Sequence, residues 1–271
     1  GRRVVVVGGG NAAVDSARVA RRLGEDTHVT LLYRRTRREM PANPEEIVAA
    51  EHEKVDIQLL AAPTRLIGEN GVLKQIEYLR MELGEPDASG RRRPVPVKGS
   101  ETIVDVNQVI NAIGQFPTML KPEQDGIISK LPITRWSTID GDAMSQFTGH
   151  EAIFTGGDSF RGPQTVVAAL ADGRKAAYAI DQYFTWGVVK GEPVRFNINR
   201  GDLKTMDAEP LKVMMNAPRQ RMPELPVEKA IKGFDQMELG LSEKQAKDEA
   251  ERCLICGCAA AFDCRLRDAM D

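Results

Sequence analysis

The N-terminal part of the chain shows two apolar patterns in close succession. Residues 2–8 hold an unbroken run of valines, which is typical of a strand buried on both faces of a parallel sheet. In residues 11–23 small side chains recur at helical spacing, which predicts a helix packed closely on that sheet through Ala13, Ala17 and Ala20. Residues 28–33 are the next apolar stretch. Strand, helix and strand within about thirty residues predict a right-handed crossover unit.

Residues 44–113 are predicted to add a second helix and several strands. The helix occupies 44–54 and has a proline in its first turn. Between 56 and 113 apolar segments alternate with turn residues, and Asn70-Gly71 is the signal of a tight β-hairpin. The stretch 84–100 holds prolines and a triple arginine, so we expect an exposed loop between two strands there.

The second half of the chain contains fewer clear periods. Residues 152–158 read as a short buried strand that ends in Gly-Gly-Asp. From Val166 onward one helix face is predicted from positions that step by three and four, namely Leu170, Gly173, Ala177, Ile180 and Phe184. Residues 187–226 suggest an extended covering segment, and a last helix at 242–252 carries Ser242 and Gln245 at capping-box spacing.

The turn between the first strand and the first helix contains the pattern G-x-G-x-x-A, formed by Gly8, Gly10 and Ala13. In such a motif the first glycine permits a tight turn, the second lets the backbone approach a pyrophosphate, and the small third residue allows close helix packing. The helix N-terminus adds N–H groups and a partial positive charge. The pattern alone is weak, and a glycine-rich turn without a ligand is the alternative. Its place between strand and helix predicts a dinucleotide site.

The end of the second strand distinguishes the two nicotinamide dinucleotides. An NAD site usually places an acidic residue there to bind the ribose hydroxyls, whereas here Tyr33 is followed by Arg34 and Arg35. Guanidinium groups pair with phosphate oxygens, so this loop favours the 2′-phosphate of NADPH. A solvated basic loop is the alternative. A nucleic-acid surface is disfavoured because aromatic residues are not interleaved with the arginines.

A third motif spans residues 155–177, with the sequence TGGDSFRGPQTVVAALADGRKAA. It places Asp158 at the end of a predicted strand and a helix start at Thr165 and Val166. Such a helix start can face an anionic or electron-rich ligand. Composition does not identify the ligand, and an ordinary strand-loop-helix connection explains the motif equally well.

All four cysteines of the chain lie within twelve residues, at Cys253, Cys256, Cys258 and Cys264. This spacing indicates thiolates that converge on a metal, and a disulfide framework does not fit it. Four thiolates bind either zinc or an iron–sulfur cluster. The crowded C-x-C spacing and the upstream redox motifs favour a 4Fe–4S cluster, while zinc and a metal-free or dithiol state remain alternatives.

Charge and hydropathy place limits on the function. The 271 residues include 37 Lys and Arg against 39 Asp and Glu, with a net charge of −2, which excludes a disordered tail and a globally basic nucleic-acid binder. No apolar run approaches the ~18 residues that span a bilayer, and no leader pattern opens the chain. We therefore expect a cytoplasmic globular protein without a membrane or nucleic-acid partner.

Taken together, these motifs resemble the NADPH-dependent flavoprotein family of the glutamate synthase small subunit, which is related to the electron-input part of dihydropyrimidine dehydrogenase. GGGNAAVDSAR resembles its NADPH fingerprint and YRRTRREMPA its phosphate-binding loop. INAIGQFP, which contains Gly114, resembles its domain-return segment, and TGGDSFRGPQTVVAALADGRKAA resembles its second flavin motif. The C-terminal cysteine segment is similar to the iron–sulfur region of multi-subunit relatives, so the resemblance covers nearly the whole chain.

The resemblance implies that a hydride passes from NADPH to FAD and that electrons continue through 4Fe–4S clusters to a partner. That partner is implied to be a subunit or domain like the glutamate synthase large subunit or another reductase, and a homo-oligomer stays open. No side chain acts as acid, base or nucleophile. Carried over by position, the pyrophosphate-binding residues are Gly8, Gly10, Asn11, Ala12 and Ala13, the 2′-phosphate residues Arg34 and Arg35, and the flavin-side residues Gly114, Gly157, Asp158, Thr165 and Val166.

The implied fold is α/β and has three parts. Residues 1–118 correspond to a Rossmann-like NADPH-binding domain with a parallel sheet, 119–190 to the C-terminal half of a split FAD-binding domain, and 191–271 to an extended segment with the cysteine cluster. The family also has an earlier FAD fingerprint and N-terminal cysteines, which this sequence does not supply. We therefore expect a fragment, inactive alone, that begins after the first FAD half and binds NADPH but not FAD.

Two other functions compete with this interpretation. A disulfide reductase of the thioredoxin reductase kind shares the layout but needs a redox dithiol beside the flavin, and residues 1–252 contain no cysteine. An NADPH-binding, zinc-stabilised sensing or interaction module is the non-enzyme alternative. It retains the first two motifs but has no use for the flavin motif.

Overall fold

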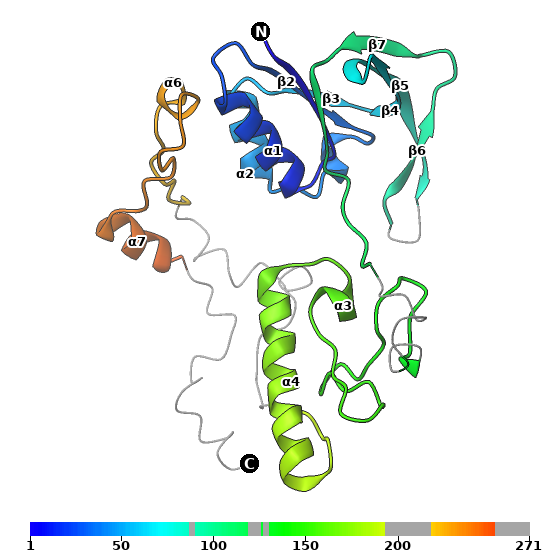
Figure 1. The fold of residues 1–271 in the computed structure, drawn as a ribbon. Helices are drawn as coiled ribbons and strands as arrows, with labels where there is room; N and C mark the ends of the chain where they lie inside the picture. The colour runs from blue at the N-terminus through cyan, green and yellow to red at the C-terminus, as the bar shows by residue number, and fades with distance from the viewer. Residues whose placement is uncertain (87–89, 119–125, 127–129, 193–217, 253–271) are drawn as a thin grey trace. The chain divides into compact units, whose positions relative to one another are not determined.

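The computed structural model describes residues 1–271 except 87–89, 119–125, 127–129, 193–217 and 253–271 (Figure 1). The chain divides into two compact units. Unit 1 combines Gly1–Ile113 with Pro218–Arg252, and unit 2 begins at Gly114 and is described up to Glu192. The domain boundaries expected near 118 and 190 stay predictions.

Unit 1 is built on a parallel sheet that confirms the predicted α/β crossover. Its strand order is β3-β2-β1-β8, and all neighbouring strands are parallel. The strands are β1 (Arg3–Val7), β2 (His28–Tyr33), β3 (Asp56–Leu59) and β8 (Gln108–Asn111). Helices α1 (Asn11–Arg22) and α2 (Pro44–His52) connect the first three strands. Because the strands are parallel, their carboxyl ends meet at one edge of the sheet.

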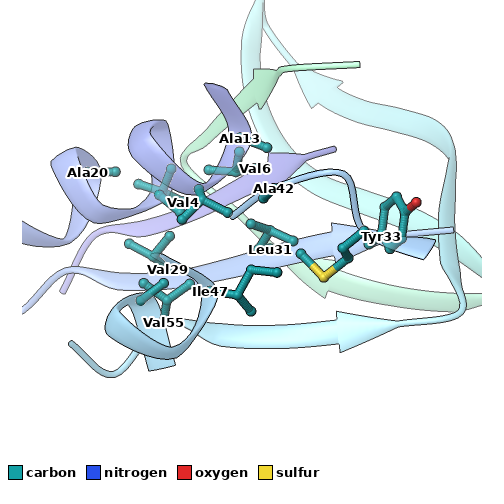
Figure 2. Packing of buried hydrophobic residues seen from close by; sticks show 14 residues of the cluster. Val4, Val6, Ala13, Ala20, Val29, Leu31, Tyr33, Ala42, Ile47 and Val55 are labelled. Carbon is teal, nitrogen blue, oxygen red and sulfur yellow. The ribbon is translucent and has the colours of Figure 1, made fainter. Parts of the chain in front are cut away.

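The valine run of β1 is buried on both of its faces, as the unbroken apolar pattern predicts. Val4 and Val6 belong to the hydrophobic cluster formed with α1 and α2 (Figure 2). Val5 and Val7 belong to a second cluster, which includes Ile76 of strand β5 and Val106, which lies between β7 and β8. A strand that alternates apolar and polar residues would contribute to only one of these two hydrophobic clusters.

The second layer is an antiparallel sheet inserted before β8. It contains β4 (Ala61–Glu69), β5 (Val72–Pro86), β6 (Arg92–Pro96) and β7 (Thr102–Asp105). The hairpin predicted at Asn70-Gly71 is confirmed, since both residues have positive φ, +51° and +76°, and Glu69 pairs with Val72. Left-handed backbone at both central positions is what a two-residue hairpin of type I′ requires.

The prediction of an exposed loop at 84–100 is partly wrong. Strand β5 continues to Pro86, and β6 pairs antiparallel with it, with Met81 opposite Pro96. Pro94 and Pro96 are accommodated because β6 is an edge strand, where one side of the backbone needs no ladder hydrogen bond. The triple arginine is exposed, as expected.

Unit 2 contains the short helix α3 (Asp158–Arg161) and the long helix α4 (Val166–Trp186). Helix α4 begins where the sequence predicts, with the Thr165 hydroxyl accepting from the N–H of Ala168, and it ends at Gly187 in the left-handed region. The strand predicted at 152–158 is wrong, since its described pairing is one isolated bridge between Phe147 and Phe154. A single bridge supplies too few hydrogen bonds to hold a regular strand.

Helix α4 does not bury the apolar face that its periodicity defines. Leu170 and Phe184 are 69% and 77% exposed, whereas its buried residues are Asp172, Ala179 and Gln182. Hydrogen bonds compensate for the burial of the Asp172 and Gln182 side chains. A pattern of hydrophobic positions does not predict the burial of polar residues. Among the helices that the structure describes, none has the length and apolarity needed to cross a membrane.

The C-terminal part of unit 1 lies against α1 and α2. It contains α6 (Val227–Ala230) and α7 (Glu243–Ala250), and the capping box predicted between Ser242 and Gln245 is present. The anchoring group is Glu53, which is 1% exposed and accepts hydrogen bonds from Arg18 and Arg22 of α1. Both arginines also contact the sulfur of Met237, so α1 holds this later segment in place.

Candidate dinucleotide-binding site

The glycine turn between β1 and α1 depends on the absence of side chains. Gly8 has a φ of +146°, and a Cβ on it would lie 2.4 Å from the carbonyl oxygen of Ala112, the residue after β8. A Cβ on Gly9 would lie 2.4 Å from two ring carbons of Tyr33 at the end of β2. The turn is therefore wedged between the ends of the two neighbouring strands, where only glycine fits.

The N-terminus of α1 is suited to an anion. Its N-cap, Gly10, makes no side-chain cap, and the first turn contains no acidic residue. The nearest atom to a Cβ built on Gly10 is Cγ of Pro41, 3.8 Å away, and the side chains of Asn11 and Ala12 are exposed. The partial positive charge of the helix end thus faces open space, while Ala13 is fully buried against the sheet.

The structure separates the arginines that follow β2. The Arg34 and Arg38 side chains are exposed. Arg35 is only 6% exposed, and its Nε donates to the carbonyl oxygen of Arg92 at 2.8 Å. Arg37 forms two hydrogen bonds with the carboxylate of Glu51, at 2.5 and 2.8 Å. Of the two arginines expected at a 2′-phosphate, Arg34 is therefore accessible and Arg35 is part of the core of the loop.

Three contacts tie the basic loop to the glycine turn. The Tyr33 hydroxyl donates to the carbonyl oxygen of Glu39 at 2.6 Å, while its ring packs on Gly9. The N–H of Ala42 donates to the Gly9 carbonyl at 3.1 Å. The N–H of Asn43 donates to Oδ1 of Asn11 at 2.9 Å. The glycine turn and the basic loop are thus one structural unit, and the connecting roles of Tyr33 and Asn43 were missed because no sequence spacing signals them.

The acidic groups of the loop are engaged by neighbouring side chains. The short helix η1 (Arg37–Glu39) begins with a capping box between Thr36 and Glu39. The hydrogen bond from the Thr36 hydroxyl holds the pKa of Glu39 below its ordinary value. The Arg37 guanidinium does the same to the pKa of Glu51. Both carboxylates are thereby paired with donors of the loop, while the side chain of Arg34 is exposed at the end of β2.

Unit 2 contains the residues predicted on the flavin side of the family pattern, and those from Gly157 to Val166 lie together at the start of α4. Gly157 has a φ of +60° and is the N-cap of α3, which begins at Asp158. The exposed Asp158 carboxylate accepts from the N–H of Gln164 at 3.3 Å, directly before the start of α4 at Thr165 and Val166. Gly114 lies at the start of the same unit, exposed and with a φ of +106°.

Metal ligands are the remaining part of the predicted site. Cys253, Cys256, Cys258 and Cys264 lie outside the described residues. In the part of the chain that the structure describes, no group of three or more His, Cys, Asp or Glu side chains is arranged to hold a metal ion. The metal-binding prediction therefore rests on the sequence alone.

Known relatives share most of this chain's length. The β subunit of the NADPH-Fe(3+) oxidoreductase of Geobacter sulfurreducens is 40% identical over an alignment of 284 residues. The alignment covers 94% of this chain and 41% of that protein. The NADPH glutamate synthase small chain of Azospirillum brasilense is 40% identical over 183 residues, which cover 68% of this chain and 37% of that protein. The chain thus spans less than half of each relative's length.

Solved structures confirm the fold. Thioredoxin reductase from T. acidophilum superposes with a TM-score of 0.51 at 19% identity, over 66% of this chain and 52% of that one. FprA of Mycobacterium tuberculosis, in complex with NADPH, superposes with a TM-score of 0.53 at 15% identity, over 71% and 56%. At such identities the likeness concerns the fold alone.

The family follows from the match that covers the glycine turn, the basic loop and the Gly157–Asp158 turn together. The model of the pyridine nucleotide-disulphide oxidoreductase family matches residues 1–173, which confirms the predicted resemblance. The chain belongs to the pyridine nucleotide-disulphide oxidoreductase family, and proteins named glutamate synthase small chain are among its relatives.

Proposed function

We propose that unit 1 binds NADPH, with the pyrophosphate at the N-terminus of α1 and the 2′-phosphate at Arg34. The observation that carries the proposal is the exposed Arg34 at the carboxyl end of β2, where an acidic residue would serve NADH. The loop that presents it is tied to the glycine turn by Tyr33, Ala42 and Asn43, so both phosphate contacts are preorganised.

Arg34→Gln tests this proposal on the purified protein. We expect the Kd for NADPH to rise about 10- to 100-fold and the Kd for NADH to stay unchanged, because hydrogen bonds to charged groups contribute about 1.5–3 kcal/mol. Isothermal titration calorimetry measures both constants. Arg35 is left intact because its burial would turn its replacement into a test of folding.

Arg37→Gln is the matched control, because it removes an exposed guanidinium that is already paired with Glu51. It should change neither Kd by more than about twofold, as expected for an exposed ion pair. An equal loss of NADPH and NADH affinity in Arg34→Gln would contradict the assignment of Arg34 to the 2′-phosphate.

We further propose that the complete protein is the electron-input subunit of a larger oxidoreductase. The relatives support this, since they are named as a β subunit of an NADPH-Fe(3+) oxidoreductase and a small chain of glutamate synthase, each one subunit of an assembly. When bound, FAD would supply an acceptor for the hydride of NADPH and a donor of single electrons. The residues of this chain would bind and orient the cofactors, and a partner subunit would take the electrons.

The flavin would contact unit 2 through the turn at Gly157 and Asp158. The Asp158 carboxylate is exposed and can accept hydrogen bonds from hydroxyl groups such as those of a ribityl chain. The neighbouring start of α4 supplies helix N–H groups, which favour negative charge. In this proposal Cys253, Cys256, Cys258 and Cys264 bind a 4Fe–4S cluster that passes electrons onward.

A further inference from the structure

Asp172 is a fully buried carboxylate in the third motif that the proposed function leaves unused. It lies in the second turn of α4 and is 0% exposed. Buried carboxylates are rare unless they are paired, because removing the charge from water is costly. Three hydrogen bonds compensate here: from Arg161 Nε at 2.6 Å, Arg161 Nη2 at 2.6 Å and the N–H of Gly157 at 3.1 Å.

These bonds fix both ends of α3. Gly157 is the N-cap of this one-turn helix and Arg161 is its last residue, so a single carboxylate holds its start and its end. The turn also packs directly on α4. A Cβ on Gly156 would lie 3.2 Å from Cβ of Asp172, and a Cβ on Gly157 would lie 3.3 Å from Cβ of Ala169.

Asp158 lies between the two points that Asp172 holds. Its own carboxylate is exposed and contacts the N–H of Gln164. The position of this carboxylate relative to the first turn of α4 is therefore set by the bonds that Asp172 makes. Without them, a four-residue helix has too few internal hydrogen bonds to keep its place.

We propose that Asp172, with Arg161, is a positioning residue for the flavin-binding turn and acts by holding Asp158 at the start of α4. This inference rests on the proposed function, because it assigns the flavin to that turn. The side chain of Asp172 is not exposed to solvent, and its two oxygens accept hydrogen bonds from Arg161 and Gly157. It therefore has no direct contact with a cofactor.

The test compares Asp172→Asn with wild type in the complete FAD-binding protein, which includes the first FAD half. The variant keeps an acceptor for Gly157 but loses the charge that pairs with Arg161. We expect the Kd for FAD, measured by flavin fluorescence, to rise at least tenfold and the flavin reduction potential to shift. The Gly157 N–H should exchange hydrogen faster, while the Kd for NADPH stays unchanged. Asp181→Asn, which changes an exposed aspartate of the same helix, should affect none of these readouts.

Two further variants keep the test decisive. If Asp172→Asn fails to fold, Arg161→Lys retains the charge but loses the two-point contact, and it should weaken FAD binding in a folded protein. Unchanged FAD affinity in either folded variant overturns the positioning role.

Asp158→Asn examines the proposed function separately. Loss of FAD in Asp158→Asn but not in Asp172→Asn rejects this inference alone, whereas unchanged FAD binding in both rejects the flavin site itself.

Discussion

Tyr33 shows how one residue joins two functional segments. It ends β2, its ring occupies the space beside Gly9, and its hydroxyl donates to the Glu39 carbonyl. The ring contact places the glycine turn, and the hydroxyl contact places the loop that carries Arg34. A smaller side chain would open a cavity at the junction, and a larger residue at position 9 would displace the ring.

Tyr33→Phe separates these two contributions. The variant keeps the ring but removes the hydrogen bond to Glu39, which for a neutral pair contributes about 0.5–1.5 kcal/mol. We expect the Kd for NADPH to rise about 3- to 10-fold and the Kd for NADH to change less, because the 2′-phosphate loop loses its support. Titration calorimetry measures both. Tyr78→Phe, in β5, is the matched control, and an equal effect from both variants would argue against the connecting role of Tyr33.

At the scale of elements, α1 has two separate functions at its two ends. Its N-terminus, at Gly10 and Asn11, faces the proposed pyrophosphate site. Its later residues Arg18 and Arg22 bind the buried Glu53 and hold the segment that contains Met237. Breaking a buried ion pair on one side typically costs about 3–5 kcal/mol, so this contact joins α1 firmly to the residue that follows α2.

The packing of α4 in unit 2 should depend on acid pH. The Arg161 guanidinium, with the Gly157 N–H and nearby Lys175, holds the pKa of Asp172 below its ordinary value. The folded state therefore gains stability above the unfolded value, about 3.9, and loses it as pH falls through the lower folded pKa. Other carboxylates titrate in the same range, among them Asp142, whose pKa the Ser145 hydroxyl lowers.

The contribution of Asp172 to the stability of unit 2 is measured by comparing wild type with Asp172→Asn. We expect the gap in free energy of unfolding between wild type and Asp172→Asn to be constant from about pH 5 to 7 and to shrink below about pH 4. Denaturant titrations across this range measure the gap. A gap that is the same at pH 3 and pH 7 would show that the ionised pair does not stabilise unit 2.

At the scale of the whole molecule, the metal content decides between the proposed electron-transfer subunit and a zinc-stabilised module. We expect Cys253, Cys256, Cys258 and Cys264 to bind one 4Fe–4S cluster after anaerobic reconstitution, with stoichiometric iron and sulfide and a broad absorbance near 400 nm. Cys256→Ser should abolish the cluster, whereas Met237→Leu, a control outside the cysteine segment of the sequence, should retain it. Tight zinc binding without iron or sulfide would support the module instead.

The sequence by itself determined the features that depend on neighbouring residues. The first crossover unit, the hairpin at Asn70-Gly71 and the caps at Thr165 and Ser242 all arise within a few residues along the chain. Backbone preference and hydrophobic period act at that range, so these elements were predicted close to their observed bounds. The position of Arg34 directly after β2 belongs to this group, because strand ends are local features.

Only the tertiary structure decided which of these residues are free to act. Arg35 is buried by a contact with Arg92, and Asp172 is buried against Arg161 on another helix. Strand β6 forms at 92–96 because a neighbouring strand pairs with it, in spite of its prolines. Partners distant in sequence satisfy the charge or hydrogen bond in each case, and a local pattern carries no record of them. The fold therefore decides that Arg34 is accessible and Arg35 is buried, although the sequence pattern treats these two arginines alike.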